Sequence, residues 1–325
     1  MKHNYIVKRI NSPFDDTAFF VRNLHKKDAF LLDCGRLGDI TNSELSDVKD
    51  IFISHTHIDH FYGFDRVIRG LLRSEKPIRL YGPPGFTKNV EGKLAGYTWN
   101  LIKSYPLTIE VYEIGYDNIC KTIFSARDGF NAVQCGYIEG DIYIDEGFVV
   151  QYCFFDHKTV SLGYRIKEPN YITINKEKLE GIGLKSGKWI GLLKEKLYNG
   201  DRDSDIFVEE VNRYFPVAEL ERLIVEYQKP QDITYITDIA PTYENFDKAI
   251  KFAKNSHLLI IESMFMKSDF MYSIEKSHLN ISLAKTIYEI SESSFVKFFH
   301  FAPKYENCKG DFYNELRSGI EEKII

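Results

Sequence analysis

A cluster of histidine and aspartate side chains directly follows one buried strand and limits what this chain can fold into. Residues 50–54 (DIFIS) have the pattern of a strand, and the hexapeptide HTHIDH follows with His55, His57, Asp59 and His60. Four such donors cannot share one face of a strand or helix, whereas on a loop at a strand end they can converge on two adjacent points. The alternative is a polar turn rich in histidine by chance, but this spacing favours a zinc or manganese site.

Three further candidate donors occupy comparable positions later in the chain. His157 follows the apolar run FVVQYCFFD, Asp238 follows ITYIT, and His300 follows FVKFF. Taken singly each is a weak signal, because a lone histidine after a strand is usually a surface residue. Strand ends on one edge of a sheet nevertheless bring such residues together. With the hexapeptide they supply seven donors, enough for two metal ions and a bridging water.

The order of the expected elements indicates an α/β fold. Short strands are expected in the first third, at 18–22 and 29–33, with one helix at 63–73. The last third alternates strands with helices, the helices at 243–254 and 281–291. Strands followed by alternating elements favour two sheets with helices on their outer faces.

The composition excludes several classes of protein. Of the 325 residues 44% are hydrophobic and 27% are charged, which excludes a disordered chain. No apolar run approaches the roughly 20 residues of a membrane span. The net charge is −5, so a polyanion would need a local basic surface. Five widely spaced cysteines and a start without an apolar leader favour reduced thiols in a cytoplasmic protein.

The hexapeptide resembles the signature of the metallo-β-lactamase superfamily, and later segments resemble one family within it, ribonuclease Z (tRNase Z). The similarity is carried in chain order by DHKTVSLGYRI, TYITDIAP, IESMF, SHLNISLA and FFHFAPKYEN. The matches run from about Phe30 to Tyr305. The resemblance implies a four-layer αββα sandwich, formed by a single domain of residues 1–325. It also implies that residues 168–205 are inserted as a protruding, flexible, substrate-binding arm.

The same resemblance divides the seven donors between two divalent metal ions, which are the implied cofactors. The donors of the first ion are His55, His57 and His157. The donors of the second ion are Asp59, His60 and His300. Asp238 bridges the two ions, and Asp59 also helps to position or deprotonate the attacking water. His278 is carried over as a catalytic histidine that protonates the departing oxygen, and zinc is preferred over manganese.

Three residues near the expected donors, His278, Glu262 and Asp33, can also be explained by a purely structural role. A histidine that precedes a helix, as His278 does, is more often a solvated cap residue. Glu262 ends an expected strand, and it either orients His278 or only satisfies the end of the sheet. Asp33, in LLDCG after another strand, is expected to hold the backbone of the metal loop by hydrogen bonds and not to bind metal.

One basic segment of the chain is formed by residues 176–196 (KEKLEGIGLKSGKWIGLLKEK). They carry six lysines against three glutamates. An ordinary pair of solvated helices also explains such a charge run. The segment lies where the family has its tRNA-binding arm, so Lys185, Lys188 and Lys194 are candidate substrate-binding residues. Trp189 is expected to offer a flat face to the substrate.

The chain departs from the family pattern at three places. The segment RINSPFDDTAFF has no convincing match to the family's N-terminal loop, with its proline and Arg-Asn pair. Ile58 stands where the family has glycine, and residues 279–281 (LNI) stand where it has Ser-Thr-Ala. These departures leave the metal donors intact and bear on the choice of substrate.

The implied reaction is hydrolysis of a phosphodiester by a hydroxide that bridges the two metal ions. In the family this reaction removes the 3′ trailer of precursor tRNA, which is therefore the expected partner of a cytoplasmic homodimer. One alternative is a metallo-hydrolase of small esters, sulfates or cyclic nucleotides, favoured by the unmatched N-terminal loop. Another is a non-catalytic RNA-binding relative, disfavoured because buried donors without a metal are costly.

Overall fold

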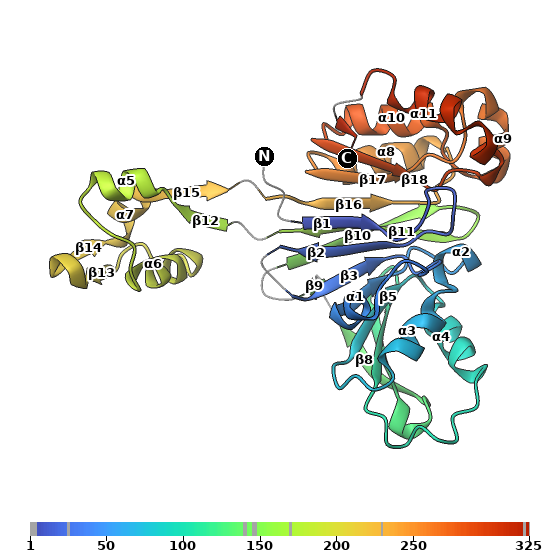
Figure 1. Ribbon diagram of the computed structural model, residues 1–325, viewed down its shortest axis with the longest axis horizontal. Coiled ribbons are helices and arrows are strands. Elements are labelled where there is room, and N and C mark those ends of the chain that lie inside the picture. The colour runs from blue at the N-terminus through green and yellow to red at the C-terminus, as the bar shows by residue number, and fades with distance from the viewer. Residues whose placement is uncertain are drawn as a thin grey trace. The chain divides into compact units, whose positions relative to one another are not determined.

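Two β-sheets pack face to face in the computed structural model of this chain, and helices cover the outer face of each sheet (Figure 1). The residues that the structure describes are 5–24, 27–138, 142–144, 148–168, 171–228, 230–320 and 323–324. The chain divides into two compact units, one of Met1–Lys167 with Gln231–Ile325 and the other of Glu168–Pro230. The expected insertion thus begins where the second unit begins, but this unit continues beyond 205 to Pro230.

The first sheet contains eight strands in sequence order, and its middle strands β3 to β6 run parallel. Its strands are β1 (Tyr5–Arg9), β2 (Phe19–Asn23), β3 (Ala29–Leu32), β4 (Val48–Phe52), β5 (Ile78–Gly82), β6 (Thr108–Ile114), β7 (Ile119–Ser125) and β8 (Ala132–Ile138). The helices of this half are α1 (Asn42–Asp47), α2 (Ile58–Phe61), α3 (Phe64–Leu71) and α4 (Phe86–Ala95). Apolar side chains at helical spacing, among them Phe64, Val67 and Leu71, bury one face of α3 against the sheet.

The second sheet contains six strands in the order β18-β17-β16-β11-β10-β9, of which β16, β17 and β18 run parallel. Its strands are β9 (Ile142–Ile144), β10 (Phe148–Asp156), β11 (Val160–Lys167), β16 (Ile233–Ile236), β17 (Leu258–Glu262) and β18 (Phe295–Phe299). The helices of this half are α8 (Tyr243–Ala253), α9 (Phe270–Lys276), α10 (Ile281–Ile290) and α11 (Lys309–Arg317). Strand β17 (LLIIE) is buried along its whole length, because one face meets the other sheet and the opposite face meets helices.

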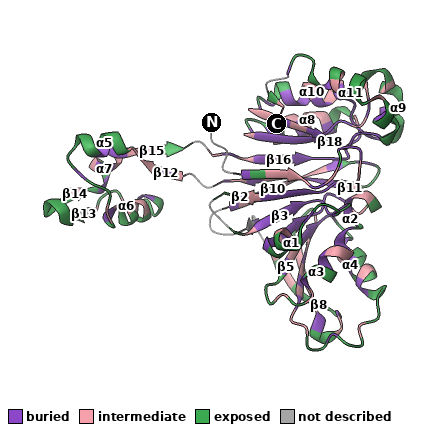
Figure 2. Cartoon of the chain, viewed as in Figure 1, coloured by how far each residue is buried: buried purple, intermediate pink, exposed green. Residues whose placement is uncertain are grey.

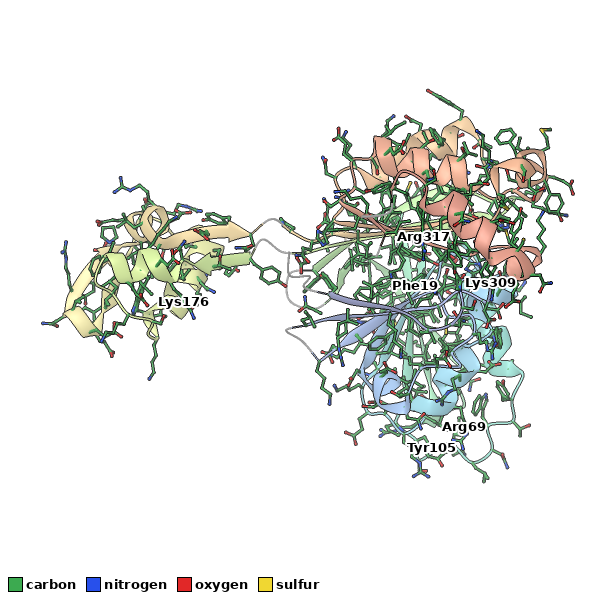
Figure 3. All side chains as sticks on the ribbon, turned by 45° about the horizontal axis from the view of Figure 1, so that its top comes forward. Phe19, Arg69, Tyr105, Lys176, Lys309 and Arg317 are labelled. Atoms are coloured by element: carbon green, nitrogen blue, oxygen red, sulfur yellow. The ribbon has the colours of Figure 1, made fainter. Side chains whose placement is uncertain are left out.

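Aromatic side chains fill the space between the two sheets. Phe19 and Phe299 meet edge to face with ring centroids 5.0 Å apart, and Phe52 stacks on Tyr81 at 4.7 Å. Phe19 is marked in Figure 3, and Figure 2 shows the strands around it coloured as buried. Each such ring contributes about 1.5–3 kcal/mol by leaving water. This core holds the two sheets together and so brings their edges close to one another.

The carboxyl ends of parallel strands from both sheets meet at one edge of the sandwich. Strand β4 ends two residues before Ser54, and strands β16 and β18 end just before Asp238 and His300. The β10–β11 turn, which contains His157, is tied to the same edge because the Ala240 amide donates to the carbonyl of Asp156 at 2.8 Å. Asp238 and His300 therefore follow strand ends at this edge, His157 lies in the adjoining turn, and the donors of the hexapeptide lie between β4 and the end of α2.

The unit Glu168–Pro230 has a core of its own. Its elements are β12 (Tyr171–Ile174), α5 (Lys176–Gly181), α6 (Trp189–Tyr198), β13 (Asp205–Val208), β14 (Arg213–Pro216), α7 (Val217–Ile224) and β15 (Val225–Gln228). Leu193, Val217 and Leu220 are fully buried in it.

Across the described part of the chain, no helix combines the length and the apolar character needed to traverse a bilayer.

Candidate metal centre

The segment from the end of β4 through α2 carries the first four predicted donors, His55 and His57 before the helix and Asp59 and His60 within it, and it is held by backbone hydrogen bonds. The Cys34 amide donates to the carbonyl of His60 at 2.8 Å, and the Thr17 amide donates to that of Asp59 at 3.0 Å. His57 is the N-cap residue of α2 and is exposed, whereas His55 and His60 are buried. The loop thus presents the donors in different directions from one short segment.

The structure brings the three donors predicted for the first ion together with Asp238. The ligand atoms of His55, His57, His157 and Asp238 all lie within 4.8 Å of one another. Oδ2 of Asp238 is 3.6 Å from Nε2 of His55 and 3.5 Å from Nε2 of His157. One carboxylate oxygen therefore faces this group of histidines.

The three donors predicted for the second ion also converge, next to the other oxygen of Asp238. Asp59, His60 and His300 place one ligand atom each within 4.8 Å of one another. Oδ1 of Asp238 is 3.4 Å from Nε2 of His60 and 3.1 Å from Nδ1 of His300. Because its two oxygens face different groups, Asp238 has the position of a bridging ligand.

The donor set fits divalent metal ions. Nε2 of His55, Nε2 of His60 and Nδ1 of His300 are buried, and none of them forms a hydrogen bond with any residue that the structure describes. A buried polar atom without a partner costs free energy, so three of them around Asp238 indicate that ligands satisfy them. Imidazole nitrogen and carboxylate oxygen are the ligands that zinc and similar ions take.

Buried polar groups behind the donors fix the orientation of their rings. Nδ1 of His60 donates to Oδ2 of Asp33 at 2.7 Å, and Nδ1 of His157 donates to the Ser277 carbonyl at 2.8 Å. Both rings therefore turn Nε2 toward Asp238. Asp33 also accepts from the Ser54 amide at 2.7 Å, which confirms the prediction that it holds the metal loop by hydrogen bonds.

The carboxylates at this edge of the sandwich favour the binding of cations. Burial opposes protonation of His300, but Asp238, the hydrogen bond to Asp59 and the nearby Glu262 carboxylate outweigh it and raise the His300 pKa to about 10. Burial also favours the neutral form of Asp59, yet its hydrogen bond to His300 and the nearby ring of His60 hold its pKa well below the usual range. The carboxylates thus create a negative potential that a metal ion can neutralise in place of these protons.

His278 lies beside the donors but interacts with a different carboxylate. Its Nδ1 donates to Oε2 of Glu262 at 2.9 Å, and Oε1 of Glu262 accepts from the Ile239 amide at 2.7 Å. His278 keeps only 8% of its surface exposed, and Asn280 is the residue that caps α10. His278 is therefore not a solvated helix cap, and Glu262 orients its ring. Burial disfavours the Glu262 carboxylate, yet the adjacent His278 lowers its pKa.

Three of these acidic or histidine residues sit in strained backbone. Asp33, Asp238 and His300 have φ values of 56°, 49° and 58°, in the left-handed region that side chains other than glycine rarely adopt. Each follows directly, or after one residue, on the end of a parallel strand. Such strain persists only where the surrounding structure imposes it, and it gathers at functional sites.

The sequence as a whole was compared with known proteins. No protein-family model matches it. Ribonuclease Z of Brevibacillus brevis is 26% identical over 279 residues, which cover 84% of this chain and 74% of that protein. Ribonuclease Z of Deinococcus radiodurans is 22% identical over 297 residues, covering 89% and 86%. The chain is a relative of ribonuclease Z.

Solved structures agree with this relationship at the level of the fold. The short form of human tRNase Z superposes with a TM-score of 0.53 at 14% identity, covering 93% of this chain and 94% of that one. A metallo-β-lactamase fold protein of Bacillus subtilis gives 0.55 at 11% identity over 98% and 94%. A diphosphatase of the PhnP family gives 0.52 at 11% identity over 98% and 92%. The predicted α/β metallo-β-lactamase sandwich is confirmed, and the relationships indicate a metal-dependent hydrolase.

An N-terminal segment that the ribonuclease Z pattern did not match also reaches the metal loop. The Thr17 amide bonds to Asp59, and Phe14 packs edge to face on Phe301 at 5.3 Å. Burial raises the pKa of Asp16, and the nearby Asp59 carboxylate adds to that rise. This relative of ribonuclease Z therefore has an acidic side chain close to its metal loop. No local sequence signal distinguishes Asp16, because only the tertiary fold brings it there.

The structure separates the three candidate lysines of the insertion. Lys188 and Lys194 line a hollow of about 580 Å³ together with Lys176, which is exposed (Figure 3). Lys185 is exposed but is not among the residues that line the hollow. Trp189 is buried in the core of this unit with 5% of its surface exposed. The expectation that Trp189 offers a flat face was therefore wrong, because the small unit needs this ring as core.

Proposed function

We propose that the chain hydrolyses a phosphodiester in 3′-extended tRNA precursors, as its relatives' name suggests. The observation that carries the chemistry is Asp238, whose two oxygens face two groups of donors. The relationship to ribonuclease Z supports the choice of substrate. Proximity of two donor groups to one carboxylate is the arrangement of dinuclear hydrolases.

In the proposed site, one ion would be held by His55, His57 and His157. The other would be held by Asp59, His60 and His300, and Asp238 would serve both. When bound, two such ions activate water and neutralise charge on phosphoryl oxygens.

The remaining steps fall to side chains of this chain. Asp59, with 35% of its side chain exposed, is the ligand placed to orient the attacking water and accept its proton. Oε2 of Glu262 accepts a hydrogen bond from Nδ1–H of His278 and so keeps that proton in place. The proton on Nε2 of His278 is therefore the one that passes to the departing oxygen.

The proposal is tested by giving metal-replete protein a 3′-extended tRNA precursor and, separately, bis(p-nitrophenyl) phosphate. We expect cleavage of both, with the RNA cut at the end of the acceptor stem. Cleavage of the small ester alone would contradict an RNA substrate.

A hydrolase of small phosphodiesters or diphosphates is the second candidate function. Asp16 lies in the N-terminal segment, which lacks the Arg-Asn pair of the family loop, and its carboxylate comes close to the metal loop. An additional negative charge there disfavours a polyanion at that side of the site. The same two-substrate assay separates the candidates, because only this second function predicts activity confined to small substrates.

We further propose that the hollow of the insertion binds RNA phosphates. Lys176, Lys188 and Lys194 all line this hollow, and the small residues Ser186 and Gly187 also line it. Other lysines of the segment are already neutralised, since Lys178 and Lys196 pair with Glu226 and Asp201. The proposal of Lys185, Lys188 and Lys194 as substrate-binding residues thus gains a fourth member, Lys176.

Replacing Lys176, Lys188 and Lys194 together with alanine should weaken precursor binding and leave hydrolysis of the small ester unchanged. Each lost phosphate contact should flatten the dependence of log affinity on log salt by roughly one unit, because fewer counterions are released. Titrations of labelled precursor at several salt concentrations measure this. Lys185→Ala alone shows whether a lysine outside the hollow contributes, and wild-type affinity and slope in the triple variant would leave the insertion without this role.

The relationship to ribonuclease Z also supports three finer proposals. These are zinc as the metal, a homodimer as the assembly, and a cytoplasmic location. Elemental analysis and light scattering on the purified protein test the first two directly.

A further inference from the structure

We propose that helix α9 is the surface on which the unpaired trailer nucleotides bind next to the scissile phosphate. This inference rests on the proposed function and adds a substrate subsite to it. It is drawn from three properties of α9, which are its exposed apolar side chains, its connection to the metal centre and the cations around it.

Helix α9 exposes apolar side chains along nearly its whole length. Phe270, Met271 and Ile274 keep 44%, 74% and 44% of their surface exposed, and Ser273 is the buried residue of the helix. Phe270 and Ile274 are one turn apart, so they share a face. A surface helix usually points polar side chains outward, and a contiguous apolar group of this kind marks a place where something binds.

The helix is joined directly to the metal centre. Its C-cap residue Ser277 accepts a hydrogen bond from the donor His157, and the His278 amide donates to the carbonyl of Ser273 at 3.0 Å. The buried ring of Phe265 contacts Tyr272 on one side, at 5.1 Å between centroids, and His278 on the other, at 6.2 Å. A chain lying along α9 therefore continues into the site where hydrolysis is proposed.

Lysine ammonium groups also lie against α9, two over the ring of Tyr272 and one at the carbonyl of Glu275. Lys276 and Lys304 lie 5.2 Å and 4.6 Å from the ring centre of Tyr272, and each also pairs with a carboxylate, Glu275 or Asp269. Lys158 follows the donor His157, and its Nζ donates to the backbone carbonyl of Glu275 at 2.7 Å. Among the described residues no carboxylate pairs with Lys158.

This combination of rings and cations favours RNA over an apolar protein surface. A second copy of this chain docking on α9 would desolvate the ammonium group of Lys158, which no described carboxylate neutralises, and burying an unpaired charge is costly. An RNA strand supplies a phosphate for Lys158, which pairs with no carboxylate among the described residues, and its bases stack on apolar and aromatic side chains. Only unpaired bases present a free face, so the single-stranded trailer is the part of a tRNA precursor that fits.

The test uses the double variant Phe270→Ser, Met271→Ser and precursors with a one-nucleotide or an eight-nucleotide trailer. Wild-type protein should bind the long trailer more tightly, and the variant should lose roughly 5- to 150-fold of this preference, the effect of one lost stacking contact. The effect should appear in KM for the long trailer, with kcat and hydrolysis of bis(p-nitrophenyl) phosphate unchanged. Tyr137→Ala, which removes a ring that is 65% exposed on β8, is the matched control.

The outcomes separate this subsite from the function on which it rests. Equal preference for the long trailer in variant and wild type would overturn the subsite. So would a variant that changes from dimer to monomer in light scattering while its trailer preference persists, because α9 would then face a second copy. If wild-type protein cleaves neither precursor, the proposed function fails. Binding of a labelled single-stranded octanucleotide then decides the subsite alone, supporting it if the variant loses this binding and overturning it otherwise.

Discussion

Replacing His278 with alanine is expected to lower turnover of an RNA substrate by about 10²–10⁴-fold, the usual worth of a general acid. The Nδ1–Glu262 hydrogen bond of 2.9 Å leaves Nε2 of His278 as the proton donor. Hydrolysis of bis(p-nitrophenyl) phosphate should fall much less, because p-nitrophenolate departs without a proton. Parallel measurements of kcat on both substrates check this.

Two controls keep the interpretation of His278 specific. Metal content should stay at the wild-type value, because the seven other side chains hold the ions. Glu262→Gln should give a smaller loss of RNA cleavage with the same dependence on the leaving group, since an amide still orients the ring but no longer stabilises its charged form. Equal losses on RNA and on the activated ester would indicate that His278 binds substrate or supports the structure and does not transfer a proton.

Replacing Asp238 with alanine is expected to reduce bound metal from about two equivalents per chain to well below one. Its Oδ2 lies near His55 and His157 and its Oδ1 near His60 and His300, so one substitution removes a ligand from both groups. Activity on every substrate should be lost with the metal. Elemental analysis after gentle purification measures the stoichiometry.

Asp59→Ala is the matched control for Asp238. The Asp59 carboxylate contacts only the second group, with Oδ2 at 3.4 Å from His60 and 3.3 Å from His300. This variant should keep about one equivalent of metal. A wild-type protein that holds one ion, and holds it equally well after Asp238→Ala, would contradict the dinuclear arrangement.

Local pattern was sufficient to predict most elements of the two large sheets. The strand expected at 29–33 is β3 (Ala29–Leu32), and the helices expected at 243–254 and 281–291 are α8 and α10. These segments combine a clear apolar period with a cap or turn signal, such as the Thr242 hydroxyl that caps α8. Burial in a two-sheet sandwich then reinforces what propensity already favours.

The insertion shows where local pattern was insufficient. Its expected end at 205 lies at the start of β13, and the unit continues through a hairpin and α7 to Pro230. Strand β12 pairs with β15, so Ile174 and Val225 are partners although some fifty residues separate them. Pairing at that separation follows from the common core of the unit and has no signature in either strand. The same core buries Trp189, which was expected to offer a flat face to the substrate as part of the arm.

The sequence by itself determined the chemistry available at the site, because imidazoles and carboxylates after apolar strands can be read residue by residue. The residue pattern alone did not determine which donors meet, and their division into two groups came from the resemblance to ribonuclease Z. Asp59 and His300, 241 residues apart, face each other only because the strands that precede them belong to sheets packed through Phe19 and Phe299. The two-sided position of Asp238 and the approach of Asp16 and α9 to the site likewise depend on that packing. Side-chain chemistry is a local property, whereas the distance between two side chains is set by the packing of the whole sandwich.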